Sequence, residues 1–589
     1  MKRPVVQFAD FGFQYKAQKN PTLTGINLVI YEGEKVLILG SSGSGKTTLA
    51  NCINGLVPFS YPGQMTGSCK VNGRETRELS VFELSRDVGT VLQDSNAQFV
   101  GLSVGEDMAF AMENNGVDRE TMRERVREQA ETVGLAQYLD ALPFHLSGGQ
   151  KQKAALGGVL GEETQVFIFD EPLASLDPKT GSAAIDLIDR ITRNDGGPPR
   201  TTIIIEHRLE DALFRPVDRI VLVDKGRIAA DMRPADILKS GILPEKGIRL
   251  PLYIGALKYA GCDLSMIQAI EDSATLELGA ENRKRLNDFF CGIAREEESR
   301  PAPHDELLRV AGVSFSYETA GGGSRSAIEN ASFTVRRGER VAFIGKNGAG
   351  KSTMAKLITG ICRPEKGAVY LGGEDYRKLT VNEIGGRVGY VMQDPDQMIV
   401  KDIIKDEVEL GLRLRRPKKA DSGLIEEQGR RALEACELYR MRNWPVSAVS
   451  YGQKKRVTVA SVLAMEPELL ILDEPTAGQD YRHYREIIAF INCLNGEYGK
   501  TVIFITHDMH LAIENTDRAV VFAGGKIIAD GDIFSILTDE RIVGEANLKK
   551  TSLHLLAEKA GLPADDFIRR YIRHEKAGSA GHTGTGAAR

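Results

Sequence analysis

Five short runs of apolar residues, the first leading into a glycine-rich loop and the other four ending in polar groups, mark the buried framework of this chain. They are Lys35–Leu39, Gln165–Glu171 and Thr201–His207, followed much later by Leu469–Glu474 and Thr501–His507. Continuous apolar runs of this length predict parallel β-strands that are buried on both faces. Ligands bind at the carboxyl ends of such strands, so the polar residues that follow each run are the candidate site residues.

A glycine-rich loop follows the first run and fits the pattern G-x-x-x-x-G-K-[S/T]. Its glycines let several backbone N–H groups point at one phosphate, and the helix predicted after it adds partial positive charge. Lys46 is expected to reach the β- and γ-phosphates, and the Thr47 hydroxyl to bind Mg²⁺. The same pattern recurs in the second half, so the candidate phosphate-binding residues are Gly40, Ser41, Ser42, Gly43, Ser44, Gly45, Lys46, Thr47 and Thr48, and Gly345, Lys346, Asn347, Gly348, Ala349, Gly350, Lys351, Ser352 and Thr353.

The chain is a tandem duplication. Lys351 lies 305 residues after Lys46, and the other landmarks recur at offsets of 300 to 303 residues. Such a period is far longer than the repeats of ~20–50 residues found in solenoids, so it indicates two copies of a whole domain. The predicted organisation is a first domain at 1–232, a helical appendage and linker at 233–306, a second domain at 307–535, a C-terminal helical appendage at 536–576 and a disordered tail at 577–589.

Paired acids and a histidine end the predicted strands in both halves. Asp170 and Asp473 are expected to hold Mg²⁺ through water, and Glu171 and Glu474 to polarise the attacking water. His207 and His507 follow the next strand, where an imidazole can donate to the γ-phosphate. The repeated positions favour catalytic roles for these two glutamates and two histidines.

Two further pairs of residues repeat at matching positions. Gln93 and Gln393 each follow a short apolar strand, where an amide can ligate Mg²⁺ or orient water. Tyr15 and Tyr317 precede the phosphate loops; one such tyrosine alone would more often be a sheet aromatic, but the repeated position favours a ring that stacks on a nucleobase. The predicted Mg²⁺ ligands are therefore Thr47, Gln93 and Asp170, and Ser352, Gln393 and Asp473.

A third anion-binding element follows in each half. The first is Ser147, Gly148, Gly149 and Gln150, and the second is Ser450, Tyr451, Gly452 and Gln453. A serine hydroxyl and glycine amides at the start of a helix can bind phosphate. The spacing alone is equally compatible with a helix that is simply capped at its N-terminus.

Composition narrows the class of protein. The net charge is −5, so no overall basic field points to nucleic acid. The seven cysteines include no C-x-x-C pair, which indicates reduced thiols of a cytosolic protein. No apolar run approaches the ~18–20 residues that span a bilayer, so action at a membrane would require docking on other chains.

Taken together, these motifs resemble those of the ATP-binding subunits of ABC transporters, over roughly residues 5–230 and 307–535. The resemblance implies α/β, tandem P-loop ABC ATPase domains, each with a RecA-like core, an antiparallel β subdomain and a helical subdomain. It also implies two ATPs held head-to-tail. The phosphate loop, acids and histidine of each half would share one ATP with the Ser-x-Gly-Gln element of the other. The two halves would then pair within one chain, so that no homodimer is required.

The stretches beside Gln93 and Gln393 further resemble energy-coupling-factor ATPases, which drive uptake of vitamins or of cobalt and nickel ions. This resemblance implies a membrane-embedded coupling protein and a small substrate-binding membrane protein as partners, no nucleic acid, and a peripheral location on the cytoplasmic face of the cell membrane. Two departures stand out: Tyr451 replaces a glycine, and Glu206 replaces the threonine that the second half keeps at Thr506.

Two other functions fit the motifs less well. A soluble tandem ABC ATPase acting on ribosomes or nucleic acid would need basic surfaces, whereas this chain is acidic overall. An ABC exporter would be expected to carry fused membrane spans, and the sequence contains none. The sequence therefore favours a two-site ATPase, with ATP and Mg²⁺ as cofactors, that is coupled to membrane transport.

Overall fold

The structure, a computed structural model, describes residues 2–92, 98–160, 164–173, 176–193, 199–293, 305–318, 323–415, 422–476 and 479–580, with the backbone alone for Tyr451 and residues 577–580. The chain divides into two compact units. The first comprises residues 1–286 with Asp480–Arg482, and the second comprises residues 287–479 with 483–589. The finer domain boundaries expected from the sequence stay predictions.

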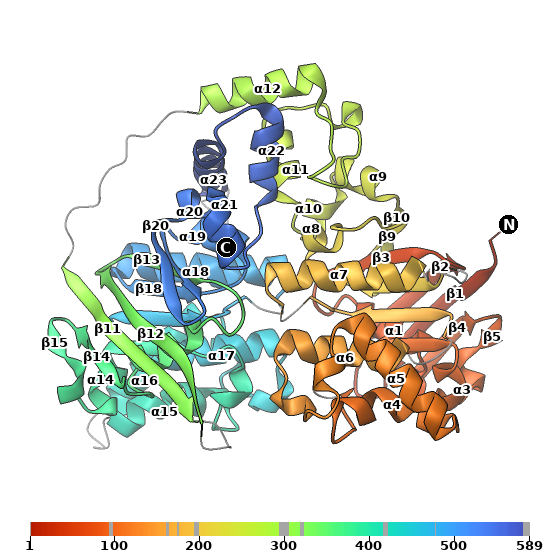
Figure 1. Cartoon of the computed structure of the whole chain (residues 1–589), viewed down its shortest axis with the longest axis horizontal. Coiled ribbons are helices and arrows are strands. Elements are labelled where there is room, and N and C mark those ends of the chain that lie inside the picture. The colour runs from red at the N-terminus through yellow and green to blue at the C-terminus, as the bar shows by residue number, and fades with distance from the viewer. Residues whose placement is uncertain are drawn as a thin grey trace. The chain divides into compact units, whose positions relative to one another are not determined.

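The first unit contains two β-sheets (Figure 1). An antiparallel sheet has the order β2-β1-β4-β5, built from β1 (Pro4–Tyr15), β2 (Leu23–Tyr31), β4 (Gly63–Val71) and β5 (Arg74–Glu75). A six-stranded sheet has the order β10-β9-β3-β8-β7-β6, built from β3 (Lys35–Leu39), β6 (Val88–Val91), β7 (Val166–Asp170), β8 (Thr201–Ile205), β9 (Arg219–Asp224) and β10 (Arg227–Met232). Strands β3, β7 and β8 are buried at every residue, as their continuous apolar runs predict. The neighbours β3, β6, β7, β8 and β9 pair in parallel, so their carboxyl ends meet at one edge.

Helices surround these sheets. They are α1 (Lys46–Ile53), α2 (Leu56–Phe59), α3 (Val81–Ser85), α4 (Val104–Asn114), α5 (Arg119–Val133), α6 (Gly148–Leu160), α7 (Pro178–Arg193) and α8 (Leu209–Ala212). Helix α1 contributes Leu49 and Ile53 to the core, where they join Phe11 of β1 and Ile38 of β3. The core thus lies where the two sheets and α1 meet, and it fixes the phosphate loop that joins β3 to α1.

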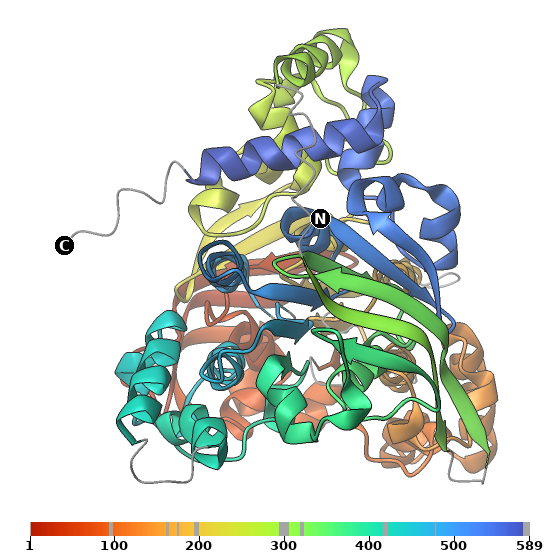
Figure 2. The same ribbon diagram turned by 90° about the vertical axis from the view of Figure 1, so that its left-hand side faces the viewer.

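The second unit repeats this plan. Its antiparallel sheet has the order β12-β11-β14-β15, built from β11 (Glu306–Glu318), β12 (Ser324–Arg336), β14 (Lys366–Leu371) and β15 (Glu374–Asp375). Figure 2 shows β11 and β12 as a pair of long green strands. Its six-stranded sheet has the order β16-β17-β18-β13-β19-β20, built from β13 (Arg340–Ile344), β16 (Val388–Val391), β17 (Leu469–Asp473), β18 (Thr501–Ile505), β19 (Arg518–Ala523) and β20 (Lys526–Asp532). The duplication that the sequence predicts is therefore confirmed at the level of strand order.

The helices of the second copy are α13 (Lys351–Ile358), α14 (Val381–Arg387), α15 (Ile404–Arg415), α16 (Ser422–Ala435), α17 (Tyr451–Leu463), α18 (Tyr481–Tyr498) and α19 (Met509–Asn515). A helical appendage follows each copy. The first contains α9 (Pro234–Lys239), α10 (Ile242–Glu245), α11 (Leu252–Tyr259) and α12 (Gly279–Gly292), and the second contains α20 (Ile533–Thr538), α21 (Glu540–Glu545), α22 (Ser552–Ala560) and α23 (Ala564–Ala580). The expected α/β fold with antiparallel and helical subdomains is thus confirmed.

The structure also bears on the thiols and on membrane crossing. All seven cysteines are free, in agreement with the reduced state expected from their spacing. Among the described residues, none of the helices combines the length and the apolar character that crossing a bilayer requires.

Candidate nucleotide sites

The first phosphate loop is held by close backbone packing. Gly45 has a φ of 106° and directly precedes α1. A Cβ on Gly40 would lie 2.3 Å from the Val223 carbonyl oxygen, so only glycine fits there. The Lys46 ammonium donates to the carbonyl oxygens of Gly40 and Ser41, over 3.0 and 2.9 Å. Burial lowers the pKa of Lys46, while the charges of Glu171 and Asp170 act in the opposite direction.

The second phosphate loop has the same construction. Gly350 has a φ of 108° before α13, and a Cβ on Gly345 would lie 2.1 Å from the Phe522 carbonyl oxygen. The Lys351 ammonium donates to the carbonyl oxygens of Gly345 and Lys346, over 2.6 and 3.0 Å. Both loops therefore present a lysine, a left-handed glycine and a helix N-terminus, as a polyphosphate site requires.

Each half brings a hydroxyl and an aspartate together beside its phosphate loop. Thr47 lies close enough to Asp170 to lower the pKa of that carboxyl in the first half, and Ser352 does the same to Asp473 in the second. Burial, with the charge of Glu171, raises the pKa of Asp170 to about 6, and its Oδ1 is buried without a hydrogen-bond partner among the described atoms. Oxygen donors of this kind fit Mg²⁺, which takes carboxylate and hydroxyl ligands beside phosphate.

The second aspartate has an extra contact that the sequence did not indicate. The Tyr390 hydroxyl on β16 donates to Asp473 Oδ2 over 3.0 Å. The matching residue of the first half is Thr90, whose hydroxyl accepts from the Asn54 amide. Burial still raises the pKa of Asp473, and the hydrogen bonds from Ser352 and Tyr390 oppose that rise.

The predicted catalytic pairs are brought together in both halves, but by different ring nitrogens. His207 Nε2 lies 2.7 Å from Glu171 Oε1, whereas His507 Nδ1 lies 2.6 Å from Glu474 Oε1. Glu171 and Glu474 both adopt a left-handed backbone, with φ of 50° and 47°. Burial raises the pKa of Glu474, but His507 and the lysines outweigh burial and hold it below its usual value. An ionised glutamate beside a histidine suits the polarisation of water.

The Ser-x-Gly-Gln elements are the N-termini of α6 and α17, and both are capping boxes. Gln150 N–H donates to Ser147 Oγ over 3.4 Å, and Ser147 N–H donates to Gln150 Oε1 over 2.9 Å. The corresponding distances at Ser450 and Gln453 are 3.3 and 3.0 Å. The serine and glutamine therefore cap their helices, and their pairing with a nucleotide stays a prediction.

The remaining predicted residues have mixed outcomes. Gln93 lies outside the described residues, and so does the side chain of Tyr451. Gln393 is exposed two residues after β16. The Tyr15 hydroxyl lies 2.9 Å from Thr48 Oγ1, and the Tyr317 hydroxyl lies 3.4 Å from Thr353 Oγ1. Both tyrosines thus adjoin the phosphate-loop helix, and their stacking on a base stays a prediction.

One buried lysine near the second site was missed by sequence reasoning. Lys455 on α17 is fully buried, and its ammonium donates to the Glu474 carbonyl oxygen. Burial lowers the pKa of Lys455 to about 8, and the negative charges of Glu474 and Asp473 act in the opposite direction by favouring the protonated ammonium. The first half has Gln152 at this position, and its amide donates to the Pro172 carbonyl oxygen. Only the comparison of the two halves, Gln against Lys after the same motif, could have signalled this residue.

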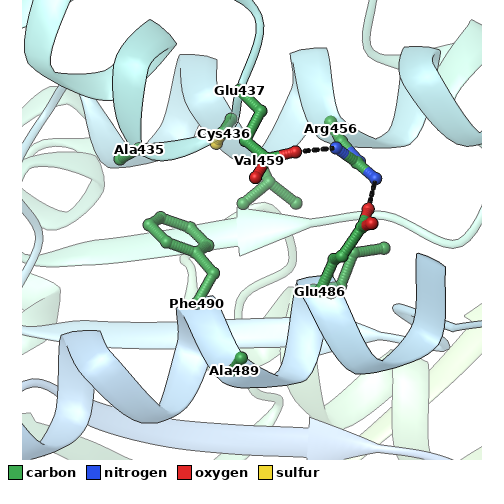
Figure 3. Close-up of a pocket in the computed structure, with 9 residues that line it drawn as sticks. Ala435, Cys436, Glu437, Arg456, Val459, Glu486, Ala489 and Phe490 are labelled. Atoms are coloured by element: carbon green, nitrogen blue, oxygen red, sulfur yellow. Dashed lines mark hydrogen bonds and ion pairs between the residues drawn. The ribbon is translucent and has the colours of Figure 1, made fainter. Parts of the chain in front are cut away.

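A cleft of about 320 Å³ lies in the second unit, apart from the phosphate-binding residues (Figure 3). Its walls come from the end of α16, from α17 and from α18. Arg456 on α17 pairs there with Glu437 and with Glu486 of α18. The ion pairs occupy its polar end, and Val459 and Phe490 line its apolar part, so the cleft contributes nothing to the nucleotide site.

A phosphate loop after a buried strand, a hydroxyl beside an aspartate, and a glutamate beside a histidine define a P-loop nucleotide hydrolase, and the capped element on the helical subdomain narrows it to the ABC class. A family model described as ABC transporter matches residues 23–174 and 328–477. The chain therefore belongs to the ATP-binding proteins of ABC transporters, and it is an ATPase. A second family model, described as ATP-binding cassette cobalt transporter, matches residues 240–315, which include α10, α11 and α12 of the first appendage and the start of β11.

Relatives match along almost the whole chain. A putative ABC transporter ATP-binding protein from Clostridium perfringens is 47% identical over 98% of this chain and 99% of its own length. Proteins of the same description from Enterococcus faecalis and Photobacterium profundum are each 46% identical, over 98% and 97% of this chain and 99% of their own lengths. Among solved structures, CbiO1 from Clostridium perfringens, described as part of the ABC transporter complex CbiONQ, is 30% identical over 41% of this chain and 95% of its own, with a TM-score of 0.36.

Proposed function

We propose that this chain is the subunit that binds and hydrolyses ATP for an importer of the energy-coupling-factor type, which takes up a vitamin or a transition-metal ion. The observation that carries the proposal is the match of residues 240–315 to the model described as ATP-binding cassette cobalt transporter. That segment follows one complete set of phosphate-loop, acid and histidine residues and precedes a second set. A single chain would therefore provide both ATPase domains of the importer.

The two nucleotides are proposed to bind in composite sites. Gly40–Thr48, Asp170, Glu171 and His207 would share one ATP with Ser450–Gln453. Gly345–Thr353, Asp473, Glu474 and His507 would share the other with Ser147–Gln150. The capping boxes support this proposal because each places a serine and the first backbone N–H groups of a 13-residue helix at its N-terminus, where an anion is favoured. Pairing would then occur within the chain.

Each residue of the site has a defined task in hydrolysis. Lys46 and Lys351 neutralise the β- and γ-phosphates, and the phosphate-loop amides orient them. Thr47 with Asp170, and Ser352 with Asp473, would hold Mg²⁺, which supplies charge neutralisation when bound; Gln93 and Gln393 complete the proposed ligands. Glu171 and Glu474 accept a proton from the attacking water, while His207 and His507 orient them and donate toward the γ-phosphate. Loss of that phosphate removes the contact that favours closure of the two halves.

Exposed apolar side chains in the described segments that follow the two glutamine positions along the chain support a membrane partner. In the first unit Leu102 and Phe144 are 77% and 67% exposed, and their segments are joined by the hydrogen bond from Val104 N–H to the Ala141 carbonyl. In the second unit Val400 and Trp444 are 71% and 50% exposed, and Ile404 N–H donates to the Trp444 carbonyl. Large apolar side chains gathered in this way mark interaction surfaces. A multi-spanning coupling protein and a small substrate-binding membrane protein are the proposed partners, which places the chain at the cytoplasmic face of the membrane.

The test compares two fractions. A tagged chain is added to detergent-solubilised membranes and, separately, to ribosomes of the same cells. We expect a multi-spanning membrane protein to co-purify and to stimulate ATP turnover. Leu102→Asp with Trp444→Asp should abolish that capture and stimulation while the chain alone keeps its basal turnover. Co-sedimentation with ribosomes and no membrane partner would instead support the alternative of a tandem ABC ATPase acting on ribosomes or nucleic acid.

A further inference from the structure

The histidine that follows the last catalytic strand is held by different groups in the two units. His207 N–H donates to Glu206 Oε2 over 3.0 Å, whereas His507 N–H donates to Glu474 Oε1 over 3.0 Å. The backbone N–H of the histidine therefore donates to the preceding residue, Glu206, in the first site. In the second site it donates to Glu474, the proposed catalytic carboxylate.

Glu206 is built into the first site as an acceptor. It is 2% exposed, and its Oε1 accepts from Leu173 N–H over 2.8 Å. Its Oε2 also accepts from Arg208 N–H, over 3.3 Å. Leu173 lies two residues after Glu171, and Arg208 lies one residue after His207. One buried carboxylate thus joins the segments that carry the catalytic glutamate and the histidine.

Thr506 cannot replace this carboxylate in the second site, because its side chain is shorter and carries one oxygen. Its hydroxyl donates to Glu474 Oε2 over 3.3 Å and accepts from Asp508 N–H over 2.9 Å. Glu474 therefore accepts from the Thr506 hydroxyl, from His507 N–H and from the His507 ring. Hydrogen bonds to an ionised carboxylate stabilise its charged form, so they lower its tendency to accept a proton from water.

We propose that Glu206 is a positioning residue of the first ATP site. It accepts the backbone N–H of His207, so that Glu171 is not required to, and cleavage of ATP at the first site is faster than at the second. The inference rests on the proposed roles of Glu171 and His207. It adds that the substitution of Thr by Glu before the histidine sets the difference in rate between the two sites.

The experiment measures single-turnover cleavage of Mg²⁺-ATP with the full chain in excess, together with the affinity for a fluorescent ATP analogue. In a Glu474→Gln background, where Glu171 is the remaining catalytic carboxylate, Glu206→Thr should slow cleavage about tenfold and change the affinity less than about twofold. Glu206→Gln keeps one carbonyl acceptor and should slow cleavage by an intermediate factor. In a Glu171→Gln background, Thr506→Glu should speed cleavage.

The matched control is Glu210→Gln. Glu210 also accepts a backbone N–H, from Leu252 over 2.9 Å, but on the side of the appendage, so its loss should leave cleavage unchanged. Glu206→Thr cleaving at its parent's rate, losing only affinity, or matching Glu210→Gln would overturn the inference. If Glu206→Thr does not fold, the cleavage rates of Glu206→Gln and Thr506→Glu test the inference instead. The inference is overturned if each of these variants cleaves ATP at the rate of its parent. A wild-type chain that cleaves no ATP would instead contradict the proposed function.

Discussion

Replacing Lys455 by glutamine tests how much a buried charge costs in the second unit. Lys455 is fully buried on α17, and its pKa falls from 10.5 to about 8. A difference of this size makes the charged lysine less favourable in the folded than in the unfolded chain by about 3 kcal/mol at pH 7. Glutamine carries no charge, and Gln152 of the first unit already donates to a carbonyl from the same position. We therefore expect Lys455→Gln to stabilise the second unit by about 2 kcal/mol at pH 7, allowing about 1 kcal/mol for imperfect bonding.

The sign of the pH dependence follows from the lowered pKa. Below about pH 8 the lysine is charged in both states, and the cost is fully present. As the pH rises from about 8 toward 10.5 the folded chain has already lost the proton while the unfolded chain is still losing it, so the cost declines. At pH 9.5 the advantage of the variant should fall by about 2 kcal/mol and so largely vanish.

Trp444 provides the assay. It is the only tryptophan of the chain and is bonded through its carbonyl to Ile404 of the helical subdomain, so its fluorescence reports unfolding of the second unit in urea. Lys454→Gln is the control: that lysine pairs with Asp396 over 2.7 Å at the surface, and its loss should matter by less than about 1 kcal/mol. A Lys455→Gln chain that is less stable than wild type at pH 7, or equally stabilised at both pH values, would refute the reasoning.

Three further outcomes follow from the sites. Lys46→Ala should halve the number of ATP molecules bound per chain, and adding Lys351→Ala should abolish binding, as measured by titration with a fluorescent analogue. The affinity of the first site for Mg²⁺ should fall as the pH is lowered through about 6, because Asp170 then becomes protonated. Titrating the Lys351→Ala chain with magnesium at pH 5.5 and at pH 7.5 checks this. Asp170→Asn should remove the difference in affinity between the two pH values. Gly452→Ala should reduce ATP turnover but not ATP binding, because the added methyl group at the start of α17 would crowd the γ-phosphate contact proposed for Ser450–Gln453; the atom nearest to that methyl group, Gln479 Oε1 at 2.5 Å, ends a flexible side chain that can move aside.

The sequence was most informative where one side chain type in one local pattern decides the structure. Continuous apolar runs can be satisfied only by strands covered on both faces, and Lys35–Leu39 is such a strand. The phosphate loops were equally predictable, because Gly40 and Gly45 occupy positions where another side chain would collide or be strained. The Ser-x-x-Gln spacing left capping and phosphate binding open, and the structure adds the capping bonds.

What could not be predicted depends on partners from distant parts of the chain. The bond from Tyr390 to Asp473 joins residues 83 positions apart, and the bond from Lys455 to Glu474 crosses from a helix to a strand end. The periodicity of apolar residues along the sequence cannot predict hydrogen bonds between residues so far apart. The opposite ring nitrogens of His207 and His507 are a further case, since both histidines occupy the same position in the repeated pattern. The preceding residue, Glu206 or Thr506, differs between the halves, and it determines which acceptor the histidine backbone finds.

These differences imply that one site binds ATP more tightly and that the other site cleaves ATP faster. Among the described buried side chains, the second site has one lysine more than the first, Lys351 and Lys455 against Lys46. A triphosphate is negative even with Mg²⁺, so it is attracted more strongly by the second site. In the second site three donors bond to Glu474, the proposed catalytic carboxylate, and they lower its tendency to take a proton from water. We therefore expect the second site to retain nucleotide and the first site to cleave it sooner.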